Sequence, residues 1–284
     1  MTATLLIEQV LNGLQFGTML FLMAAGLTLV FGVMGLINLA HGSLYMVGAF
    51  AAAALAGALV EILVLRRLYR RDHLDQVLAT FALILIFSEG TRWIFGSFPL
   101  YLDVPQALSG TVRLGTLTYP AYRLAIIVVG IAVALGLWLL INRTRLGVQI
   151  RAGEADREMI AALGIDIAKL YTVVFALGAA LAGLAGALIG PIQSVQVGMG
   201  EPVLIMAFVV VVIGGIGSIK GALVGAILVG LTDTLGRFLF PVILGAFTDP
   251  SSATAIGSAL ASMSIYILMA LILVWRPTGL MGAH

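Results

Sequence analysis

The chain has 284 residues, of which 61% are hydrophobic and only 10% are charged, with 15 lysines and arginines against 13 aspartates and glutamates. Soluble domains carry roughly 25% charged residues, so this composition excludes a soluble globular protein and indicates a protein of the lipid bilayer. The net charge of +2 does not indicate a nucleic-acid partner, and the absence of cysteine excludes disulfides, thiolate metal sites and a cysteine nucleophile.

Long apolar runs follow one another along the chain and predict an all-α polytopic membrane protein, a helical bundle of roughly eight membrane segments. Most runs have about 20 residues, which favours helices over the short alternating strands of an outer-membrane barrel. Residues 1–8 lack the basic start of a secretory signal, so we expect the first run to be a retained helix. We expect one transmembrane domain over residues 1–284, with segments near 10–31, 36–65, 77–96, 121–141, 171–190, 203–216, 219–240 and 256–275.

Two of these runs are irregular. The run 203–216 is short and ends in a glycine-rich turn, which is typical of a broken or re-entrant helix enclosed by protein. The run 36–65 begins with polar residues among apolar ones, so we also expect its start to be interrupted. A short internal echo links the two, since FGVMG at 31–35 resembles IGGIG at 213–217. Such an echo is typical of a transporter built from an internal repeat.

Glycines spaced four residues apart predict close approach between membrane helices, because glycine lets two backbones meet. This spacing occurs at Gly13 and Gly17 and at Gly186 and Gly190. The candidate packing residues of the second half are Gly214, Gly215, Gly217, Gly221 and Gly225.

Lysines and arginines collect in a few places beside the runs, and such clusters mark the cytoplasmic side of a membrane protein. Ten of the 15 cations are Arg66, Arg67, Arg70, Arg71, Arg143, Arg145, Arg151, Arg157, Lys169 and Arg276. The segment 97–119 carries only Arg113 and is expected to face outward. The runs 77–96 and 121–141 supply the two crossings that place both main clusters inside.

The segment 143–169 holds nine of the 28 charged residues and is expected to be a cytoplasmic loop. Its part 154–164 predicts a short amphipathic helix that ends at a glycine. Ala155, Met159, Ala162 and Leu163 recur at helical spacing and form one apolar face. Such a face fits a groove of a soluble partner. Packing on the membrane surface or on the protein's own bundle is the alternative.

Polar residues at membrane depth are few, and each is a candidate for a substrate path. Asn38 and His41 are one turn apart and either hydrogen-bond near the path or hold a broken helix together. Glu201 precedes a proline and favours a role at a helix start over substrate binding. The candidates are Asn38, His41, Thr80, Gln193, Gln196 and Glu201, together with Ser88, Glu89 and Asp233.

The sequence contains no grouping that predicts catalysis or metal binding. The three histidines are scattered, no serine lies in a nucleophile elbow, and no glycine-rich phosphate loop with its lysine occurs. We therefore expect no enzyme activity, no bound metal and no cofactor in this chain. An ion-coupled secondary transporter is an alternative class, although paired intramembrane carboxylates are scarce.

Four blocks of the sequence resemble the permease subunits of branched-chain amino acid ABC importers. They are AGLTLVFGVMGLINLAHGSLYMVGAF at 25–50, RAGEADREMIAALG at 151–164, VIGGIGSIKGALVG at 212–225 and RPTGL at 276–280. One departure is visible, because residues 51–57 lead almost directly into the basic cluster after 60. About one helix of the family pattern is missing there.

The resemblance implies an importer of branched-chain or other hydrophobic amino acids that works by alternating access in a bacterial inner membrane. Relatives that carry urea, amides or aromatic acids leave the substrate open. It implies a second related permease as a partner, in a homodimer or a heterodimer, and contact with membrane lipid. It further implies two cytoplasmic ABC ATPase subunits that bind ATP and Mg, and a periplasmic binding protein. The implied ATPase-coupling residues are Arg151, Glu154, Ala155, Arg157, Glu158, Met159, Ala162, Leu163 and Gly164.

Overall fold

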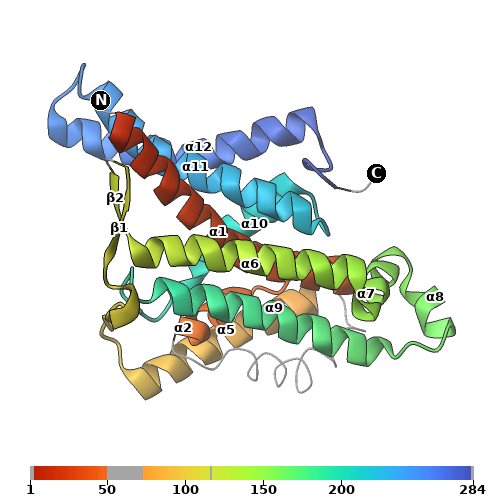
Figure 1. Ribbon diagram of the computed structural model, residues 1–284. Helices are drawn as coiled ribbons and strands as arrows, with labels where there is room; N and C mark the ends of the chain where they lie inside the picture. Colours follow the sequence, from red (N-terminus) through yellow and green to blue (C-terminus); the bar gives the residue numbers. More distant parts are fainter. Residues whose placement is uncertain (1–2, 50–72, 116, 283–284) are drawn as a thin grey trace.

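A computed structural model describes residues 3–49, 73–115 and 117–282 as a bundle of helices with one small hairpin (Figure 1). Among these described residues, six helices are long and apolar enough to cross a membrane. They are α1 (Ala3–Met34), α5 (His73–Phe95), α6 (Ala121–Arg143), α9 (Ile167–Ile189), α11 (Ile219–Leu244) and α12 (Pro250–Trp275). The predicted all-α polytopic membrane protein is confirmed.

Shorter elements connect the long helices. The helices are α2 (His41–Ala49), the 3-10 turn η2 (Gln106–Leu108), α7 (Arg145–Ala155), α8 (Arg157–Ala162) and α10 (Gly200–Gly214). The strands β1 (Thr111–Leu114) and β2 (Leu117–Pro120) pair in antiparallel register at the end of the expected outward segment 97–119, and the sequence did not predict this hairpin.

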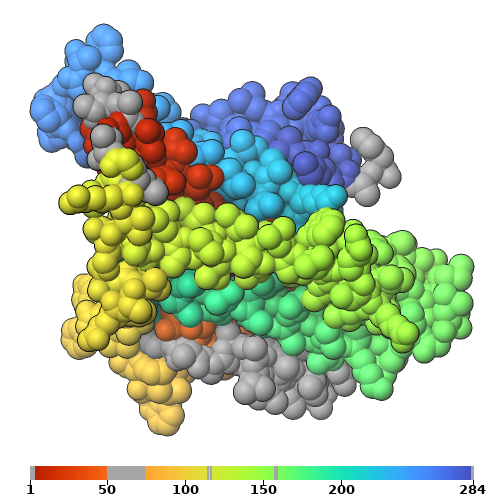
Figure 2. Space-filling view, viewed as in Figure 1, coloured from red at the N-terminus to blue at the C-terminus, as the bar shows by residue number. Residues whose placement is uncertain are grey.

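The helix α1 forms the centre of the bundle and packs against α9, α10, α11 and α6. Five consecutive residues, 21 to 25, are fully buried, so this helix is enclosed on all sides. A helix that is apolar around its whole circumference is stable only inside a membrane protein or a large core. The helices α5 and α6 are mostly uncovered instead, and Figure 2 shows α6 lying across one face of the molecule.

The hairpin and the segment containing α7 and α8 lie at opposite ends of the bundle (Figure 1). We call these the hairpin end and the basic end, since the latter carries Arg143, Arg145, Arg151, Lys169 and Arg276. At the hairpin end, the Tyr119 hydroxyl and the Arg123 guanidinium both donate to Asn12 Oδ1, at 2.9 and 2.6 Å. These bonds fix the hairpin against the start of α1.

The predicted interruptions coincide with glycines in the left-handed region, where other residues are strained. The helix α1 ends before Gly35 (φ 63°), and α10 ends before Gly215 (φ 99°). The chain after Gly35 stays irregular until α2 begins at His41. The prediction of an interrupted start to 36–65 therefore agrees with the structure. The rest of the predicted segment, from residue 50 to 65, lies outside the described residues. So does the predicted basic cluster of Arg66, Arg67, Arg70 and Arg71.

Candidate functional site

A cavity of about 620 Å³ opens between α1, α10 and α11 towards the hairpin end. Its apolar wall is supplied mainly by α1 and α10, and its polar wall by α11 and the connection between α9 and α10. It is lined by Phe16, Met19, Leu20, Tyr45, Ile189, Gln193, Ser194, Gln196, Met199, Pro202, Val203, Met206, Asp233 and Arg237.

An ion pair within α11 lines the cavity. The Arg237 Nε lies 2.9 and 3.0 Å from the two carboxylate oxygens of Asp233, and Arg237 Nη2 donates to Ser262 Oγ on α12 at 3.3 Å. The Asp233 side chain is only 9% exposed, whereas that of Arg237 is 47% exposed. Charged groups inside a membrane span are costly and mark functional positions.

The cavity thus combines an apolar wall with groups that carry both signs of charge. Methionine and aromatic side chains adapt to aliphatic groups of different shape. The two glutamines offer amide donors and acceptors, and the guanidinium keeps N–H groups that do not point at Asp233. A small zwitterion with an apolar side chain has complementary chemistry.

The predicted substrate-path residues fall into different places. Gln193 and Gln196 line the cavity. Glu201 lies in the first turn of α10, as expected for a residue at a helix start. Thr80 is buried on α5 and donates to the carbonyls of Gln76 and Val77 on its own helix.

Asn38 and His41 lie deeper in the bundle, where both side chains are almost fully buried. The ring Nε2 of His41 lies 3.1 Å from the Met23 carbonyl oxygen and joins the start of α2 to the middle of α1. The Asn38 side chain has no hydrogen-bond partner among the described residues. The His41 contact favours the second of the two interpretations, in which this residue holds the broken helix together.

The segment 143–169 differs from prediction in one respect. The segment contains the expected short helix, but its expected start at Glu154 is wrong, because α7 continues to Ala155 and a separate α8 begins at Arg157. Asp156 stands at the break, and its Oδ1 accepts a hydrogen bond from the Met159 N–H at 2.9 Å. Aspartate favours such capping positions over helix interiors. The expected end at Gly164 agrees with its φ of 85°.

The predicted apolar residues of this segment are uncovered. Met159 is 59% and Leu163 is 74% exposed, and Ala155 and Ala162 are exposed as well. Ile160 turns the other way and is 2% exposed. The segment is therefore anchored on one side and presents an apolar surface on the other. The side chains of Arg157 and Glu158 lie outside the described part of the structure.

Glu154 connects this segment to the bundle. Its carboxylate lies against Gly217, in the turn between α10 and α11, and close to Gly32 at the end of α1. Partial burial raises the pKa of the Glu154 carboxyl above its usual range. A side chain at position 217 would displace the carboxylate, so this contact depends on Gly217.

Sequence reasoning missed Arg237 and therefore the ion pair. Asp233 was singled out as a polar residue at membrane depth, but it was not placed among the main candidates. The signal was present, because residues four apart on a helix face the same side and opposite charges at that spacing attract. Most of the apolar cavity lining had no comparable signal, since phenylalanine and methionine in a membrane helix are ordinary packing residues.

The chain matches a known family of transport proteins. Its residues 9–111 and 49–274 match the sequence profile described as the permease component of branched-chain amino acid transport systems. It is 30% identical to the high-affinity branched-chain amino acid permease protein BraD of Pseudomonas aeruginosa, over 97% of this chain and 95% of the relative. No solved structure matches the chain.

Further relatives carry similar descriptions. The high-affinity branched-chain amino acid permease protein LivH of Escherichia coli K12 is 26% identical, over 97% of this chain and 95% of its own length. A probable branched-chain amino acid permease protein of Methanocaldococcus jannaschii is 28% identical over 80% of each chain. The similarity therefore extends over nearly all of the sequence.

The comparison with BraD also bears on the expected missing helix. It runs over 309 aligned positions although this chain has 284 residues, so at least 25 of them have no counterpart here. One membrane helix needs about 20 residues. The difference in length is large enough for the helix that the resemblance leads us to expect as missing. Its expected place near residue 50 lies at the start of the residues that the structure leaves undescribed.

Proposed function

The chain belongs to the permease family of branched-chain amino acid transport systems, and we propose that it imports branched-chain amino acids by alternating access through the cavity beside Asp233 and Arg237. The family consists of transport permeases, which are not enzymes. The six long apolar helices found among the described residues make the chain a multi-pass membrane protein.

The energy source in this proposal is an ATPase on the cytoplasmic side. The sequence has no phosphate-binding loop of its own, so ATP and Mg are bound by two partner subunits. The partners receive the exposed face formed by Ala155, Met159, Ala162 and Leu163. This surface is the single observation on which the proposal of ATP-driven transport rests, because exposed apolar groups on a polar segment are typical of a docking site.

The basic end faces the cytoplasm in this arrangement, in accordance with its arginines and lysines. The hairpin end then faces the periplasm of a bacterial inner membrane, where a binding protein delivers the substrate. A second related permease completes the path, and the long apolar face that α5 leaves uncovered offers it a contact surface.

Motion of the docked segment reaches the bundle through Glu154. This residue belongs to α7 and touches the turn at Gly217, from which α11 leads to the ion pair at Asp233. A displacement of α7 therefore acts on the helix that carries the charged wall of the cavity. ATP binding supplies the difference between two states that such a transmission requires.

The cavity is tested by Arg237→Gln in the assembled transporter. We expect leucine uptake into proteoliposomes, driven by ATP and the binding protein, to fall about tenfold or more. Hydrogen bonds to charged groups contribute roughly 1.5–3 kcal/mol, and the change removes such donors. The yield of assembled complex should stay near normal, since Asp233 retains an amide donor beside it.

Arg123→Gln is the matched control. Arg123 is also an arginine that hydrogen-bonds within the bundle, but it bonds Asn12 and does not line the cavity. Its uptake should stay within about twofold of the unchanged protein. Unchanged leucine uptake by Arg237→Gln would show that the substrate does not pass through this cavity.

A further inference from the structure

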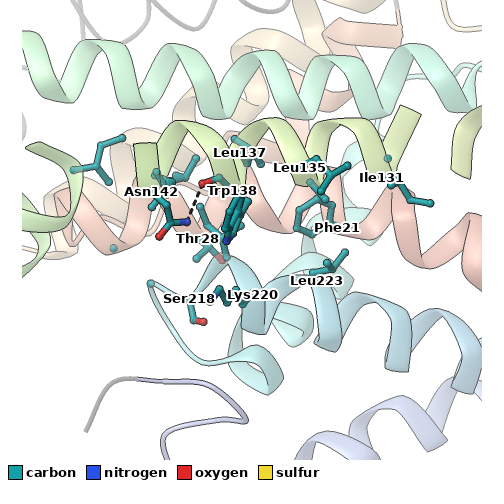
Figure 3. Close-up of a pocket in the computed structure, with 18 of the residues that line it drawn as sticks. Phe21, Thr28, Ile131, Leu135, Leu137, Trp138, Asn142, Ser218, Lys220 and Leu223 are labelled. Carbon is teal, nitrogen blue, oxygen red and sulfur yellow. Dashed lines mark hydrogen bonds between the residues drawn. The ribbon is translucent and has the colours of Figure 1, made fainter. Parts of the chain in front are cut away.

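A second cavity, of about 710 Å³, forms a groove between α1, α6 and α11 (Figure 3). It follows α1 from Leu14 to Val33, which is roughly 28 Å at the rise of an α-helix. This length is close to the roughly 30 Å of the hydrocarbon core of a bilayer. The groove ends at the basic end of the molecule.

The walls of the groove are apolar over most of its length. Ile131, Leu135 and Trp138 of α6 are 53%, 58% and 41% exposed, although all three lie within a membrane span. Figure 3 shows Leu223 of α11 on the facing wall. A groove of this composition inside a bilayer is filled by hydrocarbon or by another apolar helix.

The end of the groove at the basic end is polar and carries cations. Arg151 and Lys220 line it together with Asn142, Ser218 and Glu154. Arg151 donates one N–H to the Ile141 carbonyl, which leaves further donors of its guanidinium available. Lys220 is exposed, and no ion pair to it is found within the described part of the chain.

The position of Lys220 points to an anion. It lies in the first turn of α11, where the helix dipole favours negative charge and disfavours a cation. Ser218 caps this helix by accepting from the Gly221 N–H at 3.0 Å, and its own hydroxyl can still donate. The one carboxylate at the mouth, Glu154, is turned to Gly217. Two cations, a hydroxyl and a helix N-terminus therefore surround one opening.

We propose that this groove binds an anionic phospholipid of the inner leaflet, with an acyl chain along α6 and the phosphate between Arg151 and Lys220. The cytoplasmic leaflet has a negative surface potential, and basic groups at its level attract anionic lipids. The charge of the mouth argues for a lipid and against a helix of a second permease, which brings no phosphate. The site depends on the proposed orientation and not on the proposed substrate.

The bound lipid joins two parts of the transporter. Arg151 belongs to α7 in the docking segment, whereas Lys220 belongs to α11 in the bundle. One phosphate between them adds a second connection beside that of Glu154 with Gly217. Anionic lipid should therefore affect the coupling of ATP hydrolysis to uptake.

The test is labelling of the purified assembled transporter with phosphatidylglycerol that carries a photoreactive diazirine on its acyl chain. We expect peptides containing Ile131, Leu135 and Trp138 to be labelled, with competition by unlabelled phosphatidylglycerol and little by phosphatidylcholine. Lys220→Gln should reduce this labelling about fivefold, as expected for one lysine at an anionic surface.

A matched pair of α6 variants tests the apolar part separately. Ala134 lines the groove, whereas Ala132 is exposed on the same helix and does not line it. Ala134→Phe should abolish labelling of the groove, and Ala132→Phe should leave it unchanged. Equal competition by the two lipids would contradict the proposal. In a second test, a Leu135→Cys variant is treated with a thiol crosslinker, and a crosslink from this cysteine to the second permease would also contradict it.

Discussion

Met159→Glu is expected to abolish coupled transport while the membrane bundle stays folded. Met159 is 59% exposed on α8 and touches the partner in the proposed function. Placing a carboxylate in an apolar contact costs several kcal/mol unless it finds a partner, and roughly 3 kcal/mol corresponds to about a hundredfold weaker association. Leucine uptake and co-purification of the ATPase subunits should be lost together.

Met159→Leu is the control for this change. It retains an apolar side chain of similar volume, so uptake should stay within about twofold of the unchanged protein. Because the Asp156 cap of α8 uses the backbone N–H of residue 159, both variants can keep it. Normal uptake coupled to ATP hydrolysis in Met159→Glu would contradict a docking role for α8.

Gly221→Leu is expected to prevent correct assembly of the bundle. A side chain at this position would meet the backbone of Gly214, and a side chain at Gly214 would meet the backbone of Gly221. Backbone atoms of two packed helices cannot move as a flexible side chain can, so the cost exceeds the roughly 1–3 kcal/mol of ordinary overpacking. The yield of monodisperse protein and its thermal unfolding temperature should both fall sharply.

Gly136→Leu is the matched control, since it makes the same substitution in the span α6. A Cβ at Gly136 would have no neighbour within 4 Å among the described residues. This variant should therefore purify in normal yield. Normal yield and unfolding temperature for Gly221→Leu as well would show that α10 and α11 do not pack through their glycines.

Most of the fold could be predicted from the apolar runs. The predicted segment 121–141 corresponds to α6 at Ala121–Arg143, and 171–190 corresponds to α9 at Ile167–Ile189. Helices extend beyond the apolar stretch because polar residues at a membrane surface continue the same backbone hydrogen bonding. The start of α9 illustrates this, since Asp166 caps it by accepting from the Lys169 N–H.

The details of the functional regions depended on contacts that a linear pattern does not contain. An aspartate at position 156 can either continue a helix or cap one. The hydrogen bond from the Met159 N–H to Asp156 shows that it caps α8. The cavity brings Phe16 and Gln193 together from segments far apart in the sequence. The role of Glu154 becomes visible only when Gly217 is placed beside it.

The glycine spacing likewise predicted one feature of the packing and left another open. Their spacing indicated close packing, and in the structure a Cβ at Gly17 would lie 2.8 Å from the Ala226 carbonyl oxygen. The spacing did not show which helices meet. That information comes from the arrangement of α1 and α11, which cross at this point.

The most direct test of the account is a single cysteine at position 159, which is possible because the chain has no cysteine of its own. In Met159→Cys, the thiol should resist a membrane-impermeant maleimide added to intact cells and react after the cells are opened. In the assembled complex it should form a crosslink to an ATPase subunit. Labelling of this cysteine from outside intact cells would contradict the proposed orientation and with it the coupling of this permease to ATP.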